Sequence, residues 1–231
     1  MAKKKNKGQA QEPFSPKKFL KERMRSIPIG DCYMSDDINI HGEGIVLITR
    51  KHTGGRISVG CFLVDIWCTG VKDTYCKLRM DQPDFEEFLE RFKDYCSLCT
   101  YNEVHNLIYG AIEFAEEAGI PPHKDFVYTK YFLEEDTDDI PLIEYEYGKD
   151  GKHLLVCKSQ LEASRYLSFM KKKLSKDEFD YIIGLDNLDD DDDDYIYYDD
   201  DDDADDDYDE YEEIDGQDEG MKTRTWRKRP E

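Results

Sequence analysis

The fold is decided by the stretch GIVLITRKHTGGRISVGCFLVDIWCTGV, residues 44–71. Residues 44–50 are apolar and β-branched, and residues 56–66 alternate imperfectly between apolar and polar side chains, as strands do. The His-Thr-Gly-Gly sequence between them supplies the positive φ that a tight hairpin requires. With a bend at Gly70, this pattern predicts an antiparallel meander over residues 27–80.

Two amphipathic helices are predicted next. The first begins at Pro83 and runs to about residue 95, with Phe85, Phe88, Leu89 and Phe92 on one face. Thr100 and Glu103 have the spacing of a capping box, which predicts a second helix over residues 100–118. The apolar stripe that we expect to face the sheet is Val104, Ile108, Ala111, Ala115 and Ala118.

A second hairpin is predicted later in the chain. Its strands are residues 142–147 and 153–158, and the Asp-Gly pair at residues 150–151 is favoured in hairpin turns. A third helix is expected to residue 173, with Ser159 and Glu162 at its cap, and a last short helix at residues 175–184.

This order of elements predicts the α+β class rather than a parallel doubly wound sheet. We expect an antiparallel β-meander and a hairpin packed with three to four helices, in one domain of residues 26–185. A basic flexible arm, residues 1–25, precedes it. A disordered acidic tail, residues 186–220, and a basic tip, residues 221–231, follow it.

The acidic tail is the strongest compositional signal of the chain. Residues 186–220 contain 22 Asp or Glu and no Lys or Arg, and the 231-residue chain has a net charge of −22. Carboxylates at this density repel one another and bury no apolar surface, so the tail is predicted to stay solvated and extended.

Two interpretations of the tail compete. It engages a basic surface, on a partner protein or on its own chain, or it only keeps the protein soluble and screens the basic ends. Tyrosines punctuate it and offer stacking anchors that a solubility segment does not need, which favours partner binding. They are Tyr195, Tyr197, Tyr198, Tyr208 and Tyr211.

The sequence predicts a soluble, cytoplasmic protein. The N-terminus lacks the apolar run of an export signal, and no stretch approaches the ~18 apolar residues of a membrane helix. Seven cysteines, an odd number, agree with a reducing compartment. Cys96 and Cys99 form a C-x-x-C motif without a second pair, so we interpret them as ordinary thiols rather than a zinc site or redox dithiol, and expect no metal and no cofactor.

Six side chains are candidate catalytic residues. His105 falls at the edge of the apolar stripe of the second helix, and His123 and Asp125 follow a double proline on a loop. The structural alternative for His105 is a boundary histidine that is hydrogen-bonded to a neighbour. The alternative for His123 and Asp125 is that their spacing arises by chance.

The other three candidates are Asp65, Lys72 and Asp73, where the meander bends. They would form a carboxylate–lysine constellation of the kind that metal-dependent nucleases use. The structural alternative is an ion pair between Asp65 and Lys72, because a buried charge needs a partner.

Basic residues gather around the first hairpin tip. Arg50, Lys51 and Arg56, with His52, are candidates for contacting phosphate together with the basic arm. The body carries −11 over residues 26–185, and no recognition motif with interleaved aromatics occurs. Direct nucleic-acid binding is therefore less favoured than a solvated hairpin.

Three separated blocks resemble a family of uncharacterised bacterial proteins. They are FLVDIWCTGVKDTYC (62–76), HNLIYGAIEFAEEAGIPPHKDF (105–126) and EYGKDGKHLLV (146–156), and the family has YLVD…C-x-GVKD, HN-x-IYGAI and GKDGK in the same order. The resemblance covers residues 25–170 and leaves out the acidic tail. It implies no activity, ligand or functional residue.

Taken together, these features predict a non-enzymatic cytosolic accessory or adaptor protein whose tail engages a basic protein surface, on a nucleoprotein assembly. The alternative is a hydrolase or nuclease-type enzyme in which the tail gates a basic site. The sequence contains none of the phosphate-loop, dinucleotide-binding, serine-hydrolase or H-E-x-x-H motifs.

Overall fold

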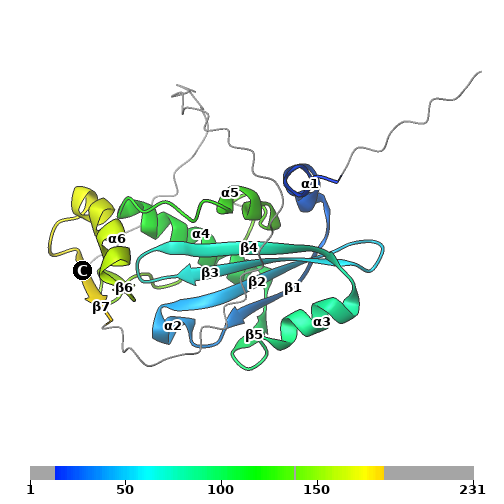
Figure 1. Cartoon of the computed structure of the whole chain (residues 1–231), viewed down its shortest axis with the longest axis horizontal. Coiled ribbons are helices and arrows are strands. Elements are labelled where there is room, and N and C mark those ends of the chain that lie inside the picture. Colours follow the sequence, from blue (N-terminus) through cyan, green and yellow to red (C-terminus); the bar gives the residue numbers. More distant parts are fainter. Residues whose placement is uncertain (1–13, 138, 185–231) are drawn as a thin grey trace, which may run out of the picture. The chain divides into compact units, whose positions relative to one another are not determined.

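A five-stranded antiparallel sheet organises the protein (Figure 1). The structure, a computed structural model, describes residues 14–137 and 139–184. The strand order is β4–β3–β2–β1–β5, so the first four strands form the predicted meander and β5 adds to β1. The bounds are β1 Ile29–Ser35, β2 Glu43–Lys51, β3 Ile57–Asp65, β4 Gly70–Met80 and β5 Cys96–Cys99.

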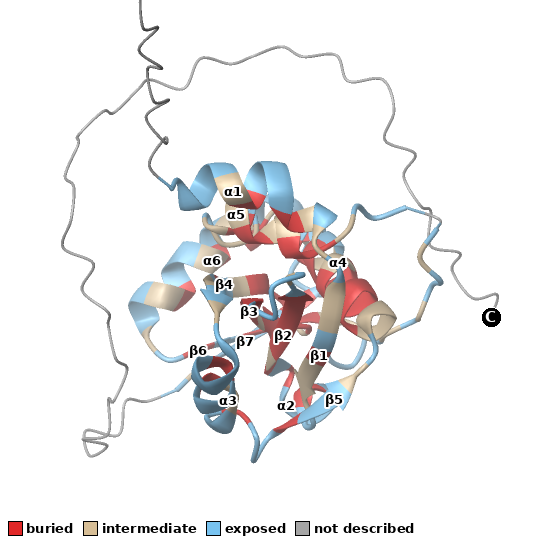
Figure 2. Ribbon diagram, turned by 90° about the vertical axis from the view of Figure 1, so that its right-hand side faces the viewer, coloured by how far each residue is buried: buried red, intermediate tan, exposed pale blue. Residues whose placement is uncertain are grey.

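Strands β2 and β3 are buried on both faces of the sheet. Val46 and Phe62 pack with helix α4 (Tyr101–Glu117) on one face, and Leu47 packs with helix α3 (Gln82–Glu90) on the other. Successive side chains of a strand point to opposite faces, so a strand covered on both faces is apolar at nearly every position. This explains the nearly continuous apolar run of β2 and β3, which Figure 2 shows as buried.

Helix α3 forms where the phenylalanine pattern predicts it. The Asp81 carboxylate caps its first turn by accepting a hydrogen bond from the backbone N–H of Asp84. Phe85, Phe88 and Phe92 are all buried against the sheet. The helix ends at Glu90, earlier than the predicted residue 95, and Phe92 packs from the turn that follows.

Helix α4 confirms the predicted capping box. The Thr100 N–H donates to the Glu103 carboxylate at 2.7 Å, and the Glu103 N–H donates to the Thr100 hydroxyl at 3.4 Å. The whole predicted stripe is buried, but it serves two cores. Its first three residues cover the sheet, whereas Ala115 and Ala118 belong to a second core that is formed with the C-terminal elements.

The N-terminal helix α1 (Pro16–Arg23) is part of the domain. Leu20, together with Met24 in the short helix η1 (Met24–Ser26), is buried in the core that α4 forms with the sheet. The sequence suggested that residues 16–25 belong to a flexible arm. The structure shows instead that they are packed on the domain. The other short helices are α2 Ile38–His41, α5 Phe126–Thr129 and η2 Lys130–Phe132.

The C-terminal elements differ from the prediction. Strand β6 (His153–Cys157) pairs in parallel with β7 (Phe179–Ile183), and helix α6 (Gln160–Lys173) connects them. The predicted hairpin of residues 142–147 with 153–158 is wrong, and so is the predicted last helix at residues 175–184.

Side-chain packing explains both errors. Tyr145 and Tyr147 pack against the core under α4, and the Tyr147 hydroxyl donates to the Asn106 carbonyl at 3.0 Å, so residues 142–147 cover the helix instead of forming a strand. The expected turn does occur at Lys149–Lys152, but only as an isolated bridge. Strand β6 finds its partner in the FDYII sequence of β7, which is rich in aromatic and β-branched residues.

A fully buried arginine ties three parts of the chain together. Arg50 on β2 has a residue exposure of 1%. Its guanidinium donates to the Phe132 carbonyl at 2.9 and 3.2 Å, to the Ile27 carbonyl at 2.8 Å and to the Glu134 carboxylate at 2.8 Å. The sheet is thereby joined to the segments that follow η1 and η2. Arg50 is consequently not available to contact phosphate, contrary to the sequence interpretation.

We predict that Arg50→Met lowers the free energy of unfolding by about 3–5 kcal/mol, because buried carbonyls and a carboxylate lose their donor. Urea unfolding measures this change. The matched variant is Lys51→Met, next in the chain, which removes an exposed ion pair with Asp31 and is expected to cost less than about 1 kcal/mol. If Arg50→Met also cost less than about 1 kcal/mol, the hydrogen bonds of the Arg50 guanidinium would contribute little to stability.

His153 is a buried histidine whose environment disfavours its charged form. It is 4% exposed, its ring stacks on Phe114 with centroids 3.8 Å apart, and its Nδ1 has no hydrogen-bond partner among the described residues. Burial lowers the pKa of His153 to about 4, against an opposing effect of the Glu178 charge.

Between the pKa of about 6.5 in the unfolded chain and about 4 in the folded protein, only the unfolded chain binds this proton. Stability therefore falls as the pH decreases through this window, by about 1–3 kcal/mol. We predict that His153→Phe, which keeps the ring, flattens the plot of melting temperature against pH. The pKa of His52 is also lowered, but His52 is present in both proteins, so identical slopes would contradict the role of His153.

Candidate functional site

Asp65 organises the turn between β3 and β4. One carboxylate oxygen accepts hydrogen bonds from the N–H groups of Trp67 and Cys68 at 2.8 and 3.1 Å. The other accepts from the N–H and the hydroxyl of Thr69 at 3.0 and 2.6 Å. Burial raises the pKa of Asp65, and these hydrogen bonds oppose the shift. All four donors belong to the turn itself, so Asp65 has a structural role.

The bend at Gly70 depends on glycine. Its φ is +68°, a conformation that other residues rarely adopt. A Cβ atom here would also lie 2.9 Å from the Ala111 carbonyl oxygen of α4. The bend was predicted from the sequence, whereas the close approach of α4 was not.

Lys72 pairs with carboxylates other than the predicted one. Its ammonium lies 2.9 Å from Glu43 on β2 and 3.5 Å from Glu162 on α6. Burial of the ammonium lowers the pKa of Lys72, but the hydrogen bond and charge of Glu43 and the charge of Glu162 outweigh it, so the pKa is raised. The Lys72 ammonium thus stays charged and links β4 to β2 and α6. The predicted ion pair between Asp65 and Lys72 is wrong.

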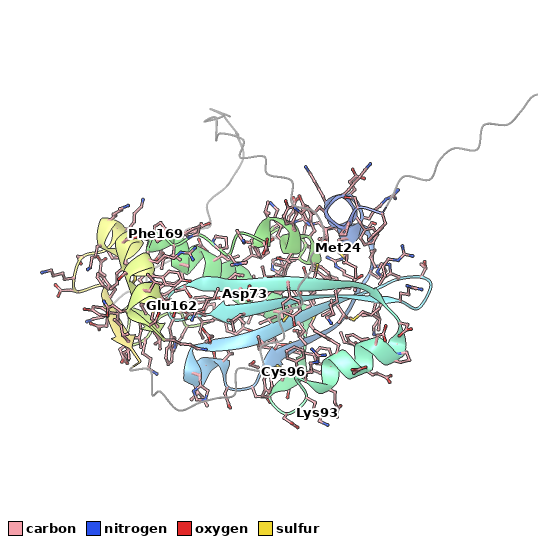
Figure 3. The ribbon with its side chains drawn as sticks, in the orientation of Figure 1. Met24, Asp73, Lys93, Cys96, Glu162 and Phe169 are labelled. Atoms are coloured by element: carbon pink, nitrogen blue, oxygen red, sulfur yellow. The ribbon has the colours of Figure 1, made fainter. Side chains whose placement is uncertain are left out.

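Three of the predicted catalytic residues meet at the surface. The Nδ1 atom of His123 lies 3.7 Å from Asp73 on β4 and 3.7 Å from Asp125. The main chain fixes the loop, because the His123 N–H donates to the Val71 carbonyl at 2.9 Å. Figure 3 shows Asp73 on β4 and Glu162 on α6.

The three side chains of this cluster are open to solvent. The Asp125 N–H donates to the Nδ1 atom of His123 at 3.4 Å. The side chains of His123, Asp125 and Asp73 are 28%, 49% and 63% exposed, so water screens the pairs.

His105 lies away from solvent in the core. It is 1% exposed, and its ring packs against Tyr101 and Tyr109 of the same helix with centroids 5.6 and 4.7 Å apart. The prediction of a boundary position is therefore wrong, because the tyrosines cover the ring. The six candidate residues divide into a surface cluster of three, two buried residues and an ion-paired lysine.

Five of the seven cysteines are buried in the cores, and Cys76 and Cys99 are partly buried. All seven are free, and burial raises the pKa of each, for example to about 12 at Cys99. Cys96 and Cys99 lie on opposite faces of β5: Cys96 is buried beside α3, and Cys99 packs on the side of α4. Within residues 14–137 and 139–184, no group of three or more His, Cys, Asp or Glu has a geometry that could hold a metal ion.

The remaining phosphate candidates stay at the hairpin tip. Lys51 pairs with Asp31 at 2.8 Å, and Arg56 donates to the Arg79 carbonyl at 3.1 Å. Arg79 was missed in the sequence because it lies more than 20 residues further along the chain; it joins the tip through the pairing of β3 with β4. The five predicted partner-binding tyrosines lie outside the described residues.

No family model, no curated protein and no solved structure matches the chain. The resemblance of three sequence blocks to uncharacterised bacterial proteins thus remains a prediction. None of the helices in the described part of the chain is long and apolar enough to cross a membrane.

We predict that Asp65→Asn destabilises the protein by about 2–3 kcal/mol, because the amide NH₂ cannot accept the hydrogen bonds that the turn donates to one carboxylate oxygen. Urea unfolding gives the value. Asp73→Asn serves as the control, since this side chain is exposed and its loss is expected to change stability by less than about 0.5 kcal/mol. If the two variants were equally stable, Asp65 would not determine the turn.

Proposed function

We propose that the protein is a non-enzymatic cytoplasmic accessory protein that binds a basic protein surface through residues 186–220. The folded domain carries this acidic segment and adds contacts of its own. The partner is a protein rich in Lys and Arg, of the kind found in nucleoprotein assemblies.

The composition of the acidic segment carries the proposal. It holds 22 carboxylates and no cation over 35 residues, and five tyrosines interrupt the charge. Such a segment attracts cationic surfaces over about one Debye length, and its tyrosines add short-range contacts that charge alone does not provide. Affinity should therefore depend steeply on salt and measurably on the tyrosines.

The placement of the candidate catalytic residues favours a binding role over the enzyme alternative. Asp65 and His105 are buried and engaged by their surroundings, and Lys72 is held by two carboxylates. The Asp73–His123–Asp125 cluster supports the alternative, because a histidine between carboxylates is a common acid–base arrangement. None of the six candidates is a Ser, Thr or Cys, whose hydroxyl or thiol such a histidine would activate as a nucleophile.

The test compares the full chain with three variants in binding to a fluorescent Lys- and Arg-rich peptide. One variant lacks residues 186–220. The second replaces the five tyrosines by serine and keeps every charge, and the third scrambles the order of residues 186–220 at constant composition. An uncharged peptide of equal length is the reference.

We expect the deletion to abolish binding and the tyrosine variant to bind several-fold more weakly, since aromatic anchors supply part of the affinity. Binding by the full chain should fall as salt is raised from ~50 to ~200 mM. If the tyrosine and scrambled variants both bound like the full chain, the interaction would be non-specific attraction. Undiminished binding by the deleted chain would overturn the proposal.

The deleted chain also tests the enzyme alternative. A phosphodiester substrate such as bis(p-nitrophenyl) phosphate would be hydrolysed faster by the deleted chain if the segment gated an active site. The matched variant His123→Gln would then remove the activity. Turnover with this dependence would replace the binding proposal by the enzyme alternative.

A further inference from the structure

The described domain carries a second charged surface, which is positive and involves residues other than those of the acidic segment. We call it the basic face, and it combines helix α1 with the tip of the β2–β3 hairpin and the end of β4. All of its cations are exposed: Lys17, Lys18, Lys21, Arg23, Arg56 and Arg79.

Ring contacts bring the two parts of the basic face together. Phe19 of α1 stacks on His52 of the hairpin with ring centroids 6.1 Å apart and planes within 10°. Burial of Leu20 and Met24 fixes the orientation of α1, so its lysines stay on the outer side. The sequence did not show this contact, because Phe19 and His52 are 33 positions apart in the chain.

The hairpin side of the face is also fixed. The Arg56 guanidinium donates to the Arg79 carbonyl at 3.1 Å. His52 itself stacks on Phe19 of α1, and its pKa is lowered by burial and then by the charges of Arg79 and Arg56. The cations of the two parts therefore act on one surface.

Few carboxylates offset this charge. Helix α1 contains one, Glu22, the hairpin turn of residues 51–56 contains none, and the end of β4 is followed by Asp81, whose carboxylate caps α3. Asp31 of β1 neutralises Lys51, which is why Lys51 is not counted in the basic face. In the sequence, residues 1–13 add four lysines and one glutamate directly before α1.

Exposed aromatic surface accompanies the cations. Phe14, which precedes α1, is 57% exposed and packs on Phe19 with centroids 5.6 Å apart. Phe14, Phe19 and His52 thus form a row of three rings along the basic face, and Phe14 leaves much of its surface open. Lys17 lies 4.9 Å from the ring of Tyr128, so its ammonium is held close to the protein surface.

We propose that the basic face binds single-stranded nucleic acid, with its cations on the phosphates and a base stacked on Phe14. Proteins that bind single strands combine a cationic surface with aromatic rings, as this face does. Lys17 and Lys21 are about 6 Å apart along the helix axis, close to two steps of a nucleic-acid strand at about 3.4 Å each.

A lipid surface fits this face less well. An interfacial helix needs an exposed apolar side to enter the bilayer. The apolar side of α1 is already buried in the core, through Leu20 and, in the following η1, Met24. A nucleic-acid strand requires only exposed charge and an open ring, and the basic face has both.

Fluorescence anisotropy tests the proposal with the purified full chain and a labelled single-stranded oligonucleotide. Binding is expected at ~50 mM salt and should weaken on the order of 10²-fold or more by ~200 mM, as phosphate contacts release counterions. The triple variant Lys17→Gln, Lys21→Gln and Arg56→Gln should bind at least about tenfold more weakly and show a less steep salt dependence.

Two further variants separate the basic face from net charge. Gln in place of Lys171, Lys172 and Lys173, exposed at the end of α6, changes the net charge equally and is expected to leave binding unchanged. Phe14→Ala should weaken binding about fivefold or more without changing the salt dependence, because stacking involves no counterion.

Four results would overturn the proposal. They are no binding by the full chain at low salt, equal losses in the two lysine variants, preference for a duplex over the single strand, and stronger binding to anionic vesicles or poly-glutamate than to the oligonucleotide. The residues tested lie outside the acidic segment, so this proposal and the binding of a basic protein can fail independently.

Discussion

The burial of β2 and β3 on both faces is the constraint from which the remaining architecture follows. Because their side chains are apolar in both directions, each face needs its own covering layer. Helix α4 provides one layer and α3 provides the other. The ends of the strands then set where polar groups can lie: Arg50 satisfies the carbonyls that surround one end of β2, and Asp65 satisfies the amides of the turn that ends β3.

The sequence was sufficient for the elements whose signals are local. The meander, the capping box of α4 and the phenylalanine face of α3 depend on residues within a few positions of one another, and the structure contains all three. The C-terminal region was misread because β6 and β7 are parallel partners separated by a helix. Nothing in either strand distinguishes a parallel partner from the hairpin partner that the Asp-Gly turn suggested.

The candidate site was less predictable than the fold, because its contacts are made between distant elements. Lys72 has partners on β2 and α6, and His123 meets Asp73 only because the loop after α4 bonds to β4. The residue types were chosen correctly for charge and chemistry, but their partners could not be read from spacing. Arg50 was mispredicted for the same reason. An arginine next to a hairpin turn is expected to be exposed, but segments at η1 and η2, distant in sequence, bury it.

The distribution of the cysteines gives the protein built-in reporters of local opening. Cys61 and Cys96 lie in the core beside α3, Cys68 and Cys157 in the core between α4 and α6, and Cys32 in the core under α4. Thiols react only when they become accessible, and regions of a protein open with different free energies. The order in which these thiols become labelled under native conditions would thus reveal which layer separates from the sheet first.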